Sequence, residues 1–448
     1  MKKLYKLALL MIAICAPLSG NAGNVIVKTE KAVGETMTFA TNGDISLTLS
    51  WGNGEEEIIG STGEPFDVTV KHETLTISSS SNLTRLYAAD NGLTEIDLAG
   101  VATTLVKLNC SSNKLKTLNL SACTKLSDLD CQDNQIETIT FRNMPAIRNL
   151  NCMDNKLQTF NYTLAMSMES ILADNNELTS LPTTKTTKLK QLYCQNNSLA
   201  TLDLSNNAML KTLVASNNQL EELDLSKNTL LEELWVGNNA LTSLNVRTTT
   251  KLVSLVANDN NMDSVMWTKN EPATLKYLDL SGNNLFPLYF PRVYNNAPLI
   301  SYYKLDNQNP FTLTSKNVDI DVRQDWNLII NRDGWSNVLR PTIDYISGET
   351  VLEKGTDYKF QSASSFNTTF MKPYSNVIAR ITNDRYFPGL IYESKPFNVV
   401  DPTVGIDILN TEEKNAKQEI YTLEGVRVSG KNLKKGVYII NGKKAIIR

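Results

Sequence analysis

One spacing constrains this chain more than any other feature of its 448 residues. The pattern L-x-x-L-x-(small)-x-x-N-x-L recurs ten times between residues 83 and 285, with steps of 22, then seven times 21, then 23 residues. The units start at Leu83, Leu105, Leu126, Ile147, Met168, Leu189, Leu210, Leu231, Leu252 and Leu275. Because one short unit cannot bury its own apolar row, ten units in register predict a solenoid in which neighbouring coils share a core.

The ninth position of every unit is asparagine. These residues are Asn91, Asn113, Asn134, Asn155, Asn176, Asn197, Asn218, Asn239, Asn260 and Asn283. A side-chain amide is both a donor and an acceptor, so a stacked column of asparagines can satisfy the backbone groups where each coil turns. An apolar residue there would leave buried peptide groups unpaired, at about 1–3 kcal/mol each. We therefore predict a structural asparagine ladder.

Residues 83 to about 290 resemble the leucine-rich-repeat family. The likeness is greatest to the short secreted bacterial type, whose second half reads L-x-x-L-D-L-S, as in Leu202-Asp203-Leu204-Ser205 and Leu223-Asp224-Leu225-Ser226. The resemblance implies a mainly β or α/β fold: a right-handed solenoid with a parallel sheet on its concave side and tight turns on its convex side. Ten strands at about 4.8 Å spacing would make a sheet roughly 45–50 Å long.

Four of the six cysteines share the sixth position of their units, which points inward: Cys110, Cys131, Cys152 and Cys194. Neighbouring side chains in a parallel stack lie about one strand spacing apart, whereas a disulfide needs converging Cβ atoms about 3.8 Å apart. We interpret these thiols as small buried hydrophobes rather than as disulfides or metal ligands. Cys123 lies on the other side of its coil, where no partner is evident.

The first 22 residues have the features of a secretory signal. Lys2, Lys3 and Lys6 precede an apolar run over residues 7–18 that is too short to span a bilayer, and Gly20 and Ala22 suit a cleavage site. Cys15 raises the alternative of a lipoprotein, but Ile14 precedes it where a lipobox needs a small residue. Cleavage removes three lysines and no acidic residue, which takes the net charge from -3 to -6. No later segment is a candidate membrane span, so we expect an exported protein that is extracellular or on the outer cell surface, with the periplasm as an alternative.

The segments that flank the repeats have period-two patterns typical of β-strands. We expect a β-rich cap over residues 23–82, where Phe66-Asp67-Val68-Thr69-Val70 is one such run. Short strands separated by turn residues indicate a β-sandwich over residues 300–400. Within it, residues 379–389 resemble the immunoglobulin-like modules that often follow such repeats, although the paired cysteines of antibody domains are absent.

Residues 404–448 resemble the C-terminal sorting domain of type IX secretion. The resemblance rests on Ile420-Tyr421-Thr422-Leu423-Glu424-Gly425, on Leu433 followed by Gly436-Val437-Tyr438-Ile439-Ile440, and on a basic final strand. It implies delivery to the outer surface of a Gram-negative bacterium. The usual Pro-Asn-Pro element is missing, since residues 406–417 contain no proline. A plain β-meander at the end of the chain is the alternative.

The inventory of reactive residues argues against an enzyme. His72 is the single histidine, and no nucleophile motif, HExxH, Walker A or dinucleotide fingerprint accompanies it. We therefore expect no catalytic residue, no metal site and no cofactor. A calcium ion bridged by Asp128, Asp130 and Asp133 is a chemical alternative, although acidic residues at strand edges are usually only solvated.

Binding has better support, because alternation places the third, fifth and seventh positions of each unit on the concave face, with the eighth at its edge. The fifth positions are Tyr87, Asn109, Asp130, Asn151, Leu172, Tyr193, Val214, Trp235, Val256 and Asp279. The five from Leu172 to Val256 form an unbroken apolar and aromatic column, and contiguous exposed apolar surface usually marks a contact. The strand preference of such residues, or a neighbouring domain that covers them, would also explain the column.

The predicted face is acidic. Its acidic residues are Asp90, Asp128, Asp130, Asp133, Asp154, Asp174, Glu233, Asp259 and Asp279, against which stand only Arg85 and Lys107. Such a face repels phosphate backbones, so nucleic acid is excluded as a partner. The sequence predicts an adhesin-like protein that grips a protein or glycan ligand with the column and with Tyr87, Asp128, Asp130, Asp154, Asp174 and Glu233. A surface scaffold whose repeats display other modules is the alternative, and the sequence does not predict the oligomeric state.

Overall fold

The chain forms two compact units: unit 1 comprises Met1–Leu285 and Pro291–Lys304, and unit 2 comprises Phe286–Phe290 and Leu305–Arg448. The computed structural model describes residues 23–141, 144–160, 166–267, 274–285, 302–308, 320–321, 342–362, 365–383, 387–400, 406–408, 420–423, 426–428, 436–440 and 443–447. The expected signal over residues 1–22 lies outside the described residues. The described residues are strands, turns and loops, and they contain no helix that could cross a membrane.

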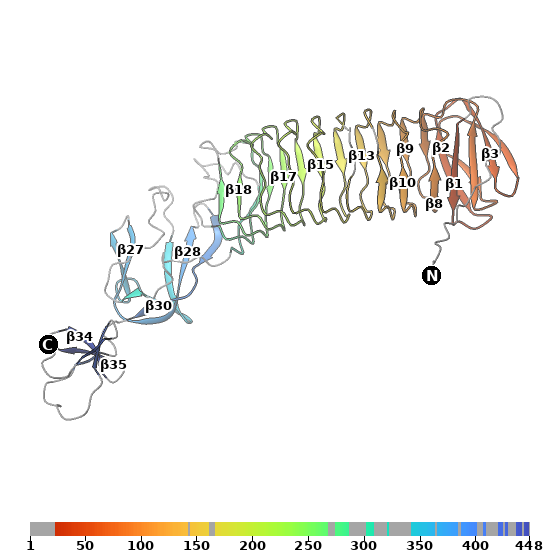
Figure 1. Cartoon of the computed structure of the whole chain (residues 1–448). Helices are drawn as coiled ribbons and strands as arrows, with labels where there is room; N and C mark the ends of the chain where they lie inside the picture. Colours follow the sequence, from red (N-terminus) through yellow and green to blue (C-terminus); the bar gives the residue numbers. More distant parts are fainter. Residues whose placement is uncertain are drawn as a thin grey trace, which may run out of the picture. The chain divides into compact units, whose positions relative to one another are not determined.

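Each of the ten predicted repeats contributes one strand to a single sheet of unit 1, which we call the main sheet (Figure 1). These strands are β7 (Arg85–Tyr87), β9 (Lys107–Asn109), β11 (Asp128–Asp130), β13 (Asn149–Asn151), β14 (Ser170–Leu172), β15 (Gln191–Tyr193), β16 (Thr212–Val214), β17 (Glu233–Trp235), β19 (Ser254–Val256) and β21 (Tyr277–Asp279). They pair in parallel with equal repeat positions opposite each other, as with Leu192 and Leu213. The solenoid predicted from the repeat is therefore confirmed.

The main sheet extends one strand beyond the ten predicted units. Strand β22 (Tyr302–Lys304) pairs in parallel with β21, and Tyr302 lies opposite Tyr277. The step between these two tyrosines is longer than any step between the predicted units, and Gln308 replaces the expected ninth-position asparagine. Because of these two departures, the repeat pattern does not predict this coil, and the sequence predicts a sandwich that starts at residue 300.

Six strands precede the repeats: β1 (Asn24–Thr29), β2 (Thr36–Thr41), β3 (Ile45–Trp51), β4 (Glu56–Ser61), β5 (Phe66–Thr69) and β6 (Thr74–Ser79). Strand β2 runs antiparallel to β7, with Ala40 opposite Tyr87, and β5 pairs with β2. The main sheet thus continues from the first repeat into these strands. The remaining four form a second sheet with β8 (Leu93–Asp97), in the order β4-β3-β6-β1-β8.

The core of the solenoid is built from four positions of every unit, namely the first, fourth, sixth and eleventh. All of these side chains are at most 3% exposed in all ten units. On the other side of the coils, β10 (Thr117–Asn119) pairs with β12 (Thr138–Thr140), and β18 (Ser243–Asn245) pairs with β20 (Ser264–Met266). Each coil therefore encloses one apolar row between its two extended segments.

The asparagine ladder forms hydrogen bonds both within a coil and between coils. The Nδ2 atom of Asn155 donates to the carbonyl oxygens of Cys131 at 3.0 Å, Cys152 at 3.2 Å and Met153 at 3.0 Å, and its Oδ1 accepts from the Ile136 amide at 2.9 Å. The other interior ladder residues repeat this arrangement, as Asn218 does. The first member differs, because Asn91 exchanges hydrogen bonds of 2.8 and 2.7 Å with the backbone of Thr38 in β2.

The residue before each ladder asparagine has a left-handed backbone conformation. Its φ lies between 51° and 65° in all ten units: Asp90, Ser112, Asp133, Asp154, Asn175, Asn196, Asn217, Asn238, Asp259 and Gly282. Asparagine, aspartate and glycine tolerate this conformation better than other residues do. The composition of this edge therefore follows from the turn that every coil makes.

The five described cysteines are free and buried. Cys110, Cys131, Cys152 and Cys194 have no exposed surface, and Cys123 is 1% exposed. Burial raises the pKa of Cys110 to about 12 and that of Cys123 to about 11, because the thiolate is poorly solvated inside the protein. These thiols pack as small apolar side chains.

Unit 2 is also built from strands. One sheet has the order β23-β30-β28-β24-β25, with β29 on β28, and β26 pairs with β27. The bounds are β23 (Ile320–Asp321), β24 (Thr342–Ser347), β25 (Thr350–Val351), β26 (Tyr358–Ser362), β27 (Ser365–Phe370), β28 (Tyr374–Asn383), β29 (Phe387–Glu393) and β30 (Phe397–Val400). Buried Tyr345 packs edge-on against the rings of Tyr358 and Phe370, with centroids 4.8 and 4.9 Å away.

The last residues of the chain form a separate sheet of five strands in the order β31-β35-β34-β32-β33. Their bounds are β31 (Ile406–Ile408), β32 (Ile420–Thr422), β33 (Arg427–Val428), β34 (Gly436–Ile440) and β35 (Lys443–Ile447). Strand β34 lies between β32 and β35 and is antiparallel to both.

Candidate ligand-binding face

The outward face of the main sheet consists of the third and fifth positions of each repeat. In most repeat strands the central residue is buried and the two flanking residues are exposed or half-buried. Parallel pairing in register brings side chains of equal position into rows across the strands. The face is thus an ordered surface on which each row contributes one side chain per coil.

The predicted column from Leu172 to Val256 is not continuous on this surface. Trp235 is 42% exposed, and Leu172, Tyr193 and Val256 are half-buried, but Val214 is only 3% exposed. Val214 pairs with Tyr193 on one side and Trp235 on the other. Because neighbouring strands are about 4.8 Å apart, these two larger side chains cover it. The prediction that Val214 offers a contact surface is therefore wrong.

Trp235 has a fixed orientation on the face. Its indole Nε1 donates a hydrogen bond to the Ser254 hydroxyl at 3.1 Å, which connects β17 with the neighbouring strand β19. Further along, Tyr277 and Tyr302 stack with centroids 4.5 Å apart and an angle of 11° between their rings. These tyrosines are 38% and 47% exposed. The sequence interpretation missed both: Tyr277 is a third-position residue whose row was not followed, and Tyr302 belongs to the unrecognised coil.

A hollow of about 280 Å³ lies on the face near the first repeats, and we call it the polar hollow. It is lined by Tyr87, Lys107, Leu108, Asn109, Asp128, Leu129, Asp130, Asn149, Leu150, Asn151, Ser170 and Leu172. Asn149 Nδ2 donates to Asp128 Oδ1 at 2.6 Å, and the Lys107 ammonium lies 3.7 Å from Asp128 Oδ2. The hollow brings together Tyr87, Leu172, Asp128 and Asp130, four of the predicted contact residues.

The two carboxylates of the polar hollow differ in environment. Burial alone would raise the pKa of Asp128, but hydrogen bonds from Ser127 and Asn149 and the nearby Lys107 charge outweigh burial and lower that pKa. Asp130 accepts a hydrogen bond from the Gln132 amide at 3.2 Å, and burial raises its pKa. Asp130 is therefore the less well compensated of the two charges.

Asp174, a predicted contact, and Asp279, another acidic residue of the predicted face, have structural roles instead. Asp174 is 2% exposed and accepts hydrogen bonds from the Gln195 amide at 2.9 Å and from Gln195 Nε2 at 3.1 Å. Asp279 is 9% exposed and bonds to Ser281 at 2.6 Å. The prediction that Asp174 faces a ligand is wrong, because its carboxylate is used to hold the next coil. Glu233 is exposed, as predicted.

Asp154 ends a row of side-chain amides along the left-handed edge. Asn175 donates to Asp154 at 2.7 Å, Asn196 to Asn175 at 2.6 Å, Asn217 to Asn196 at 2.6 Å, and Asn238 to Asn217 at 2.7 Å. All of these bonds run in the same direction and end on a carboxylate. The acidic edge is consequently part of the turn architecture, and the calcium alternative gains no support, since no group of three metal-binding side chains occurs among the described residues.

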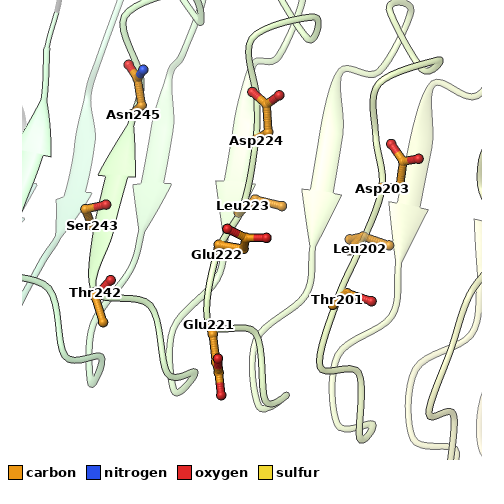
Figure 2. Close-up of a pocket in the computed structure, with 10 residues that line it drawn as sticks. All are labelled: Thr201, Leu202, Asp203, Glu221, Glu222, Leu223, Asp224, Thr242, Ser243 and Asn245. Atoms are coloured by element: carbon orange, nitrogen blue, oxygen red, sulfur yellow. The ribbon is translucent and has the colours of Figure 1, made fainter.

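A second hollow lies on the opposite side of the coils, beside Glu221 and Glu222 (Figure 2). In Figure 2, Asp203, Asp224 and Asn245 form a row across three successive coils. Each accepts a hydrogen bond from the backbone amide two residues later, at 2.9, 2.8 and 3.2 Å. Hydrogen bonds from Ser205 and Ser226 lower the pKa of Asp203 and Asp224. The aspartate of the L-D-L-S pattern is thus a turn residue.

His72 has a structural partner. Its Nδ1 accepts a hydrogen bond from the Thr74 amide at 3.2 Å, between β5 and β6. The geometry assigns it to a turn.

One family model and several solved structures are similar to parts of this chain. The leucine-rich-repeat model matches residues 274–293, and no curated protein matches the chain. Among solved structures, the functional domain of InlJ from Listeria monocytogenes, which includes a cysteine ladder, is 20% identical with a TM-score of 0.34, over 72% of this chain and 92% of its own. An internalin, inlF, from Listeria monocytogenes is 23% identical with a TM-score of 0.37, over 45% and 62%. YopM, an effector from Yersinia pestis, is 28% identical with a TM-score of 0.34, over 41% and 50%. The repeats of this chain form a solenoid of parallel strands, and residues 274–293 match the leucine-rich-repeat model.

Proposed function

We propose that this chain is an exported, adhesin-like binding protein without catalytic activity, and that the outward face of the main sheet grips a protein or glycan ligand. The observation that carries the proposal is Trp235, an aromatic ring 42% exposed in the middle of an ordered sheet and oriented by Ser254. Tryptophan and tyrosine supply much of the energy at binding interfaces. Tyr193, Tyr277 and Tyr302 extend this aromatic surface on either side.

The charges on the face support a ligand other than nucleic acid. Asp128, Asp130 and Glu233 remain on the outward face after Asp174 and Asp279 are assigned to the turns, while Arg85 and Lys107 lie near one end and Lys304 of β22 lies near the other. Nucleic-acid binding depends on several phosphate contacts by Lys and Arg, and this face offers no such row.

The experiment is a binding screen of purified protein against a panel of host proteins and glycans. We expect Trp235→Ala and Tyr193→Ala to weaken the interaction that the screen identifies, because each removes a large exposed contact. Glu221→Ala is the matched control, since Glu221 is exposed on the opposite side of the coils. An interaction that survives both aromatic substitutions would sink the proposal. A stable oligomer that protects Trp235 from a fluorescence quencher would instead favour the scaffold alternative.

Export forms a separate part of the proposal. The likeness of residues 404–448 to a type IX sorting domain, and the signal-like first 22 residues, support delivery to the cell surface. We expect a chain that lacks residues 404–448 to stay inside the cell envelope, where protease added to whole cells cannot digest it. Equal digestion of the full and shortened chains would contradict the sorting role.

A further inference from the structure

We infer that the polar hollow is a saccharide subsite that binds a linear, neutral glycan of extended pyranose units lying across the strands. This inference rests on the proposed function and names the ligand class for one end of the outward face. It is carried by the hydrogen-bonding groups that the hollow offers, by its shape and by its balance of charge.

The hollow offers donors and acceptors together. Asn109 uses its Oδ1 to accept from the amide and hydroxyl of Ser111, at 2.9 and 2.7 Å, which leaves its Nδ2 without a partner in the described part of the chain. Asn149 donates to Asp128, and its Oδ1 has no partner among the described residues. The second carboxylate oxygen of Asp130 is free in the same sense. A hydroxyl both donates and accepts, so neighbouring sugar hydroxyls can satisfy amides and carboxylates at once.

The shape of the hollow fits a chain rather than a compact ligand. It extends from Tyr87 on β7 to Leu172 on β14, across β9, β11 and β13, which is about 19 Å at 4.8 Å per strand. One pyranose unit of an extended glycan is about as long as one strand spacing. Successive sugars would therefore meet the same two rows of side chains in successive coils.

The ends of the hollow are apolar, as the CH faces of sugars require. Leu172 forms one end, and the ring of Tyr87 forms the other. The Arg85 guanidinium lies 5.1 Å from the centre of the Tyr87 ring and donates to its hydroxyl at 3.2 Å. Because these contacts already hold the ring, little conformational entropy is lost when a sugar packs against it.

The charges disfavour anionic ligands and leave little uncompensated charge for a cationic one. Asp128 and Asp130 repel uronic and sialic acids, and Lys107, 3.7 Å from Asp128, already compensates one of these two carboxylates. Desolvation of Asp130 also makes a neutral hydrogen-bond donor a suitable partner, because a hydroxyl compensates the carboxylate without bringing in another charge that must be desolvated.

The experiment titrates the full chain with cellohexaose, chitohexaose and mannohexaose by calorimetry and saturation-transfer NMR. Sialyllactose, polygalacturonate and a lysine-rich peptide serve as charged probes. We expect saturable binding of at least one neutral hexasaccharide, weaker binding of its disaccharide, and no binding of the charged probes. Asn149→Ala should weaken the binding about five- to tenfold, the loss typical of one hydrogen bond to a buried or half-buried partner.

Two controls separate this inference from the proposed function. Glu221→Ala removes an exposed side chain on the opposite side of the coils and should leave glycan affinity unchanged. If Trp235→Ala abolished glycan binding while Asn149→Ala and Asn109→Ala retained it, the polar hollow would not be the saccharide subsite. The outward face would still be the binding surface. The saccharide subsite would also be overturned if none of the three neutral hexasaccharides bound at millimolar concentration, or if the lysine-rich peptide alone bound. In either case, a protein ligand found in the screen would still support the proposed function.

Discussion

At the scale of single residues, the asparagine at the ninth position of every unit is explained by hydrogen bonding in the turn. Asn155 is 8% exposed and serves three carbonyl groups and one amide in two neighbouring coils. The sequence interpretation predicted this role, because an amide side chain can donate two hydrogen bonds and also accept at the same buried position.

Replacing one ladder asparagine should therefore be costly. Asn155→Ala leaves the Ile136 amide without its partner and removes one of the two side-chain donors of the Cys131 carbonyl, and we expect a loss of about 1–3 kcal/mol in the free energy of unfolding. Chemical denaturation followed by circular dichroism measures this loss. Asn149→Ala is the control, since it removes an exposed amide of the same coil. A loss no larger than that of the control would contradict the ladder as a stabilising element.

The left-handed edge explains acidic residues that the sequence interpretation counted on the predicted face or its edge, among them Asp154, which it assigned to the ligand. Asp90, Asp133, Asp154 and Asp259 all have φ near 50° to 56°. A sequence shows which residues lie at the eighth position, but backbone dihedral angles decide whether they serve the turn or a partner. Aspartate and asparagine suit both purposes, so composition alone could not separate them.

Asn196, with φ of 55°, tests this explanation. Asn196→Val should lower the free energy of unfolding by about 1–2 kcal/mol, because a β-branched residue is strained in the left-handed region, whereas Asn196→Gly should cost less. Gln191→Val, at an extended position of the neighbouring strand, should be nearly neutral. Thermal unfolding of the three variants gives the comparison, and equal losses for Val and Gly at position 196 would argue against backbone strain.

The buried thiols should make stability depend on alkaline pH. Burial holds the pKa of Cys110 at about 12, above the value of 9.0 of an ordinary thiol, so the unfolded chain releases this proton first as the pH rises. The contribution of Cys110 is therefore fully present below about pH 9 and is lost between pH 9 and 12, by up to about 1.4 kcal/mol per pH unit. Comparing urea unfolding of the natural chain and Cys110→Ala from pH 7 to 11 isolates this effect, and parallel curves would contradict it.

At the scale of elements, periodicity predicted the repeat strands because each coil obeys the same two constraints, a buried apolar row and a polar turn. Strand β22 was not predicted, because the ninth position of its coil is Gln308 instead of asparagine. The burial of Val214 could not be predicted either, because it depends on the size of Tyr193 and Trp235 in the neighbouring strands rather than on Val214 itself.

The strands before the repeats should be essential for the solenoid. Strand β2 supplies the backbone partner of β7, and Thr38 in β2 supplies the hydrogen bonds of Asn91. A chain without residues 23–82 would expose these groups and the apolar residues of the first coil, including Leu83 and Leu86. We expect such a chain to aggregate or unfold, measured by size-exclusion chromatography and circular dichroism. Native-like secondary structure in a monomer would show that the repeats need no cap.

At the scale of the whole molecule, the division into two compact units separates the binding surface from the rest of the chain. Unit 1 holds all ten predicted repeats, Trp235 and the polar hollow, whereas unit 2 has its own aromatic core around Tyr345. Each coil of a solenoid is stabilised by its contacts with the two neighbouring coils, so a defect in one repeat destabilises its neighbours within the same unit. The aromatic core of unit 2 is built from residues of unit 2, so we expect such a defect to leave it in place.

Calorimetry of the full chain should therefore resolve two unfolding transitions. Asn155→Ala should lower the melting temperature of only one transition, that of unit 1. Tyr345→Ala removes a side chain with no exposed surface and its 2.7 Å hydrogen bond to Thr368. It should lower the melting temperature of only the other transition, because it lowers the free energy of unfolding of unit 2 by about 3–5 kcal/mol. Glycan or protein ligands of the outward face should raise the first transition alone, because a ligand stabilises only the unit that binds it. A single transition that both substitutions shift would mean that the two units unfold together, and ligand binding would then stabilise the whole chain.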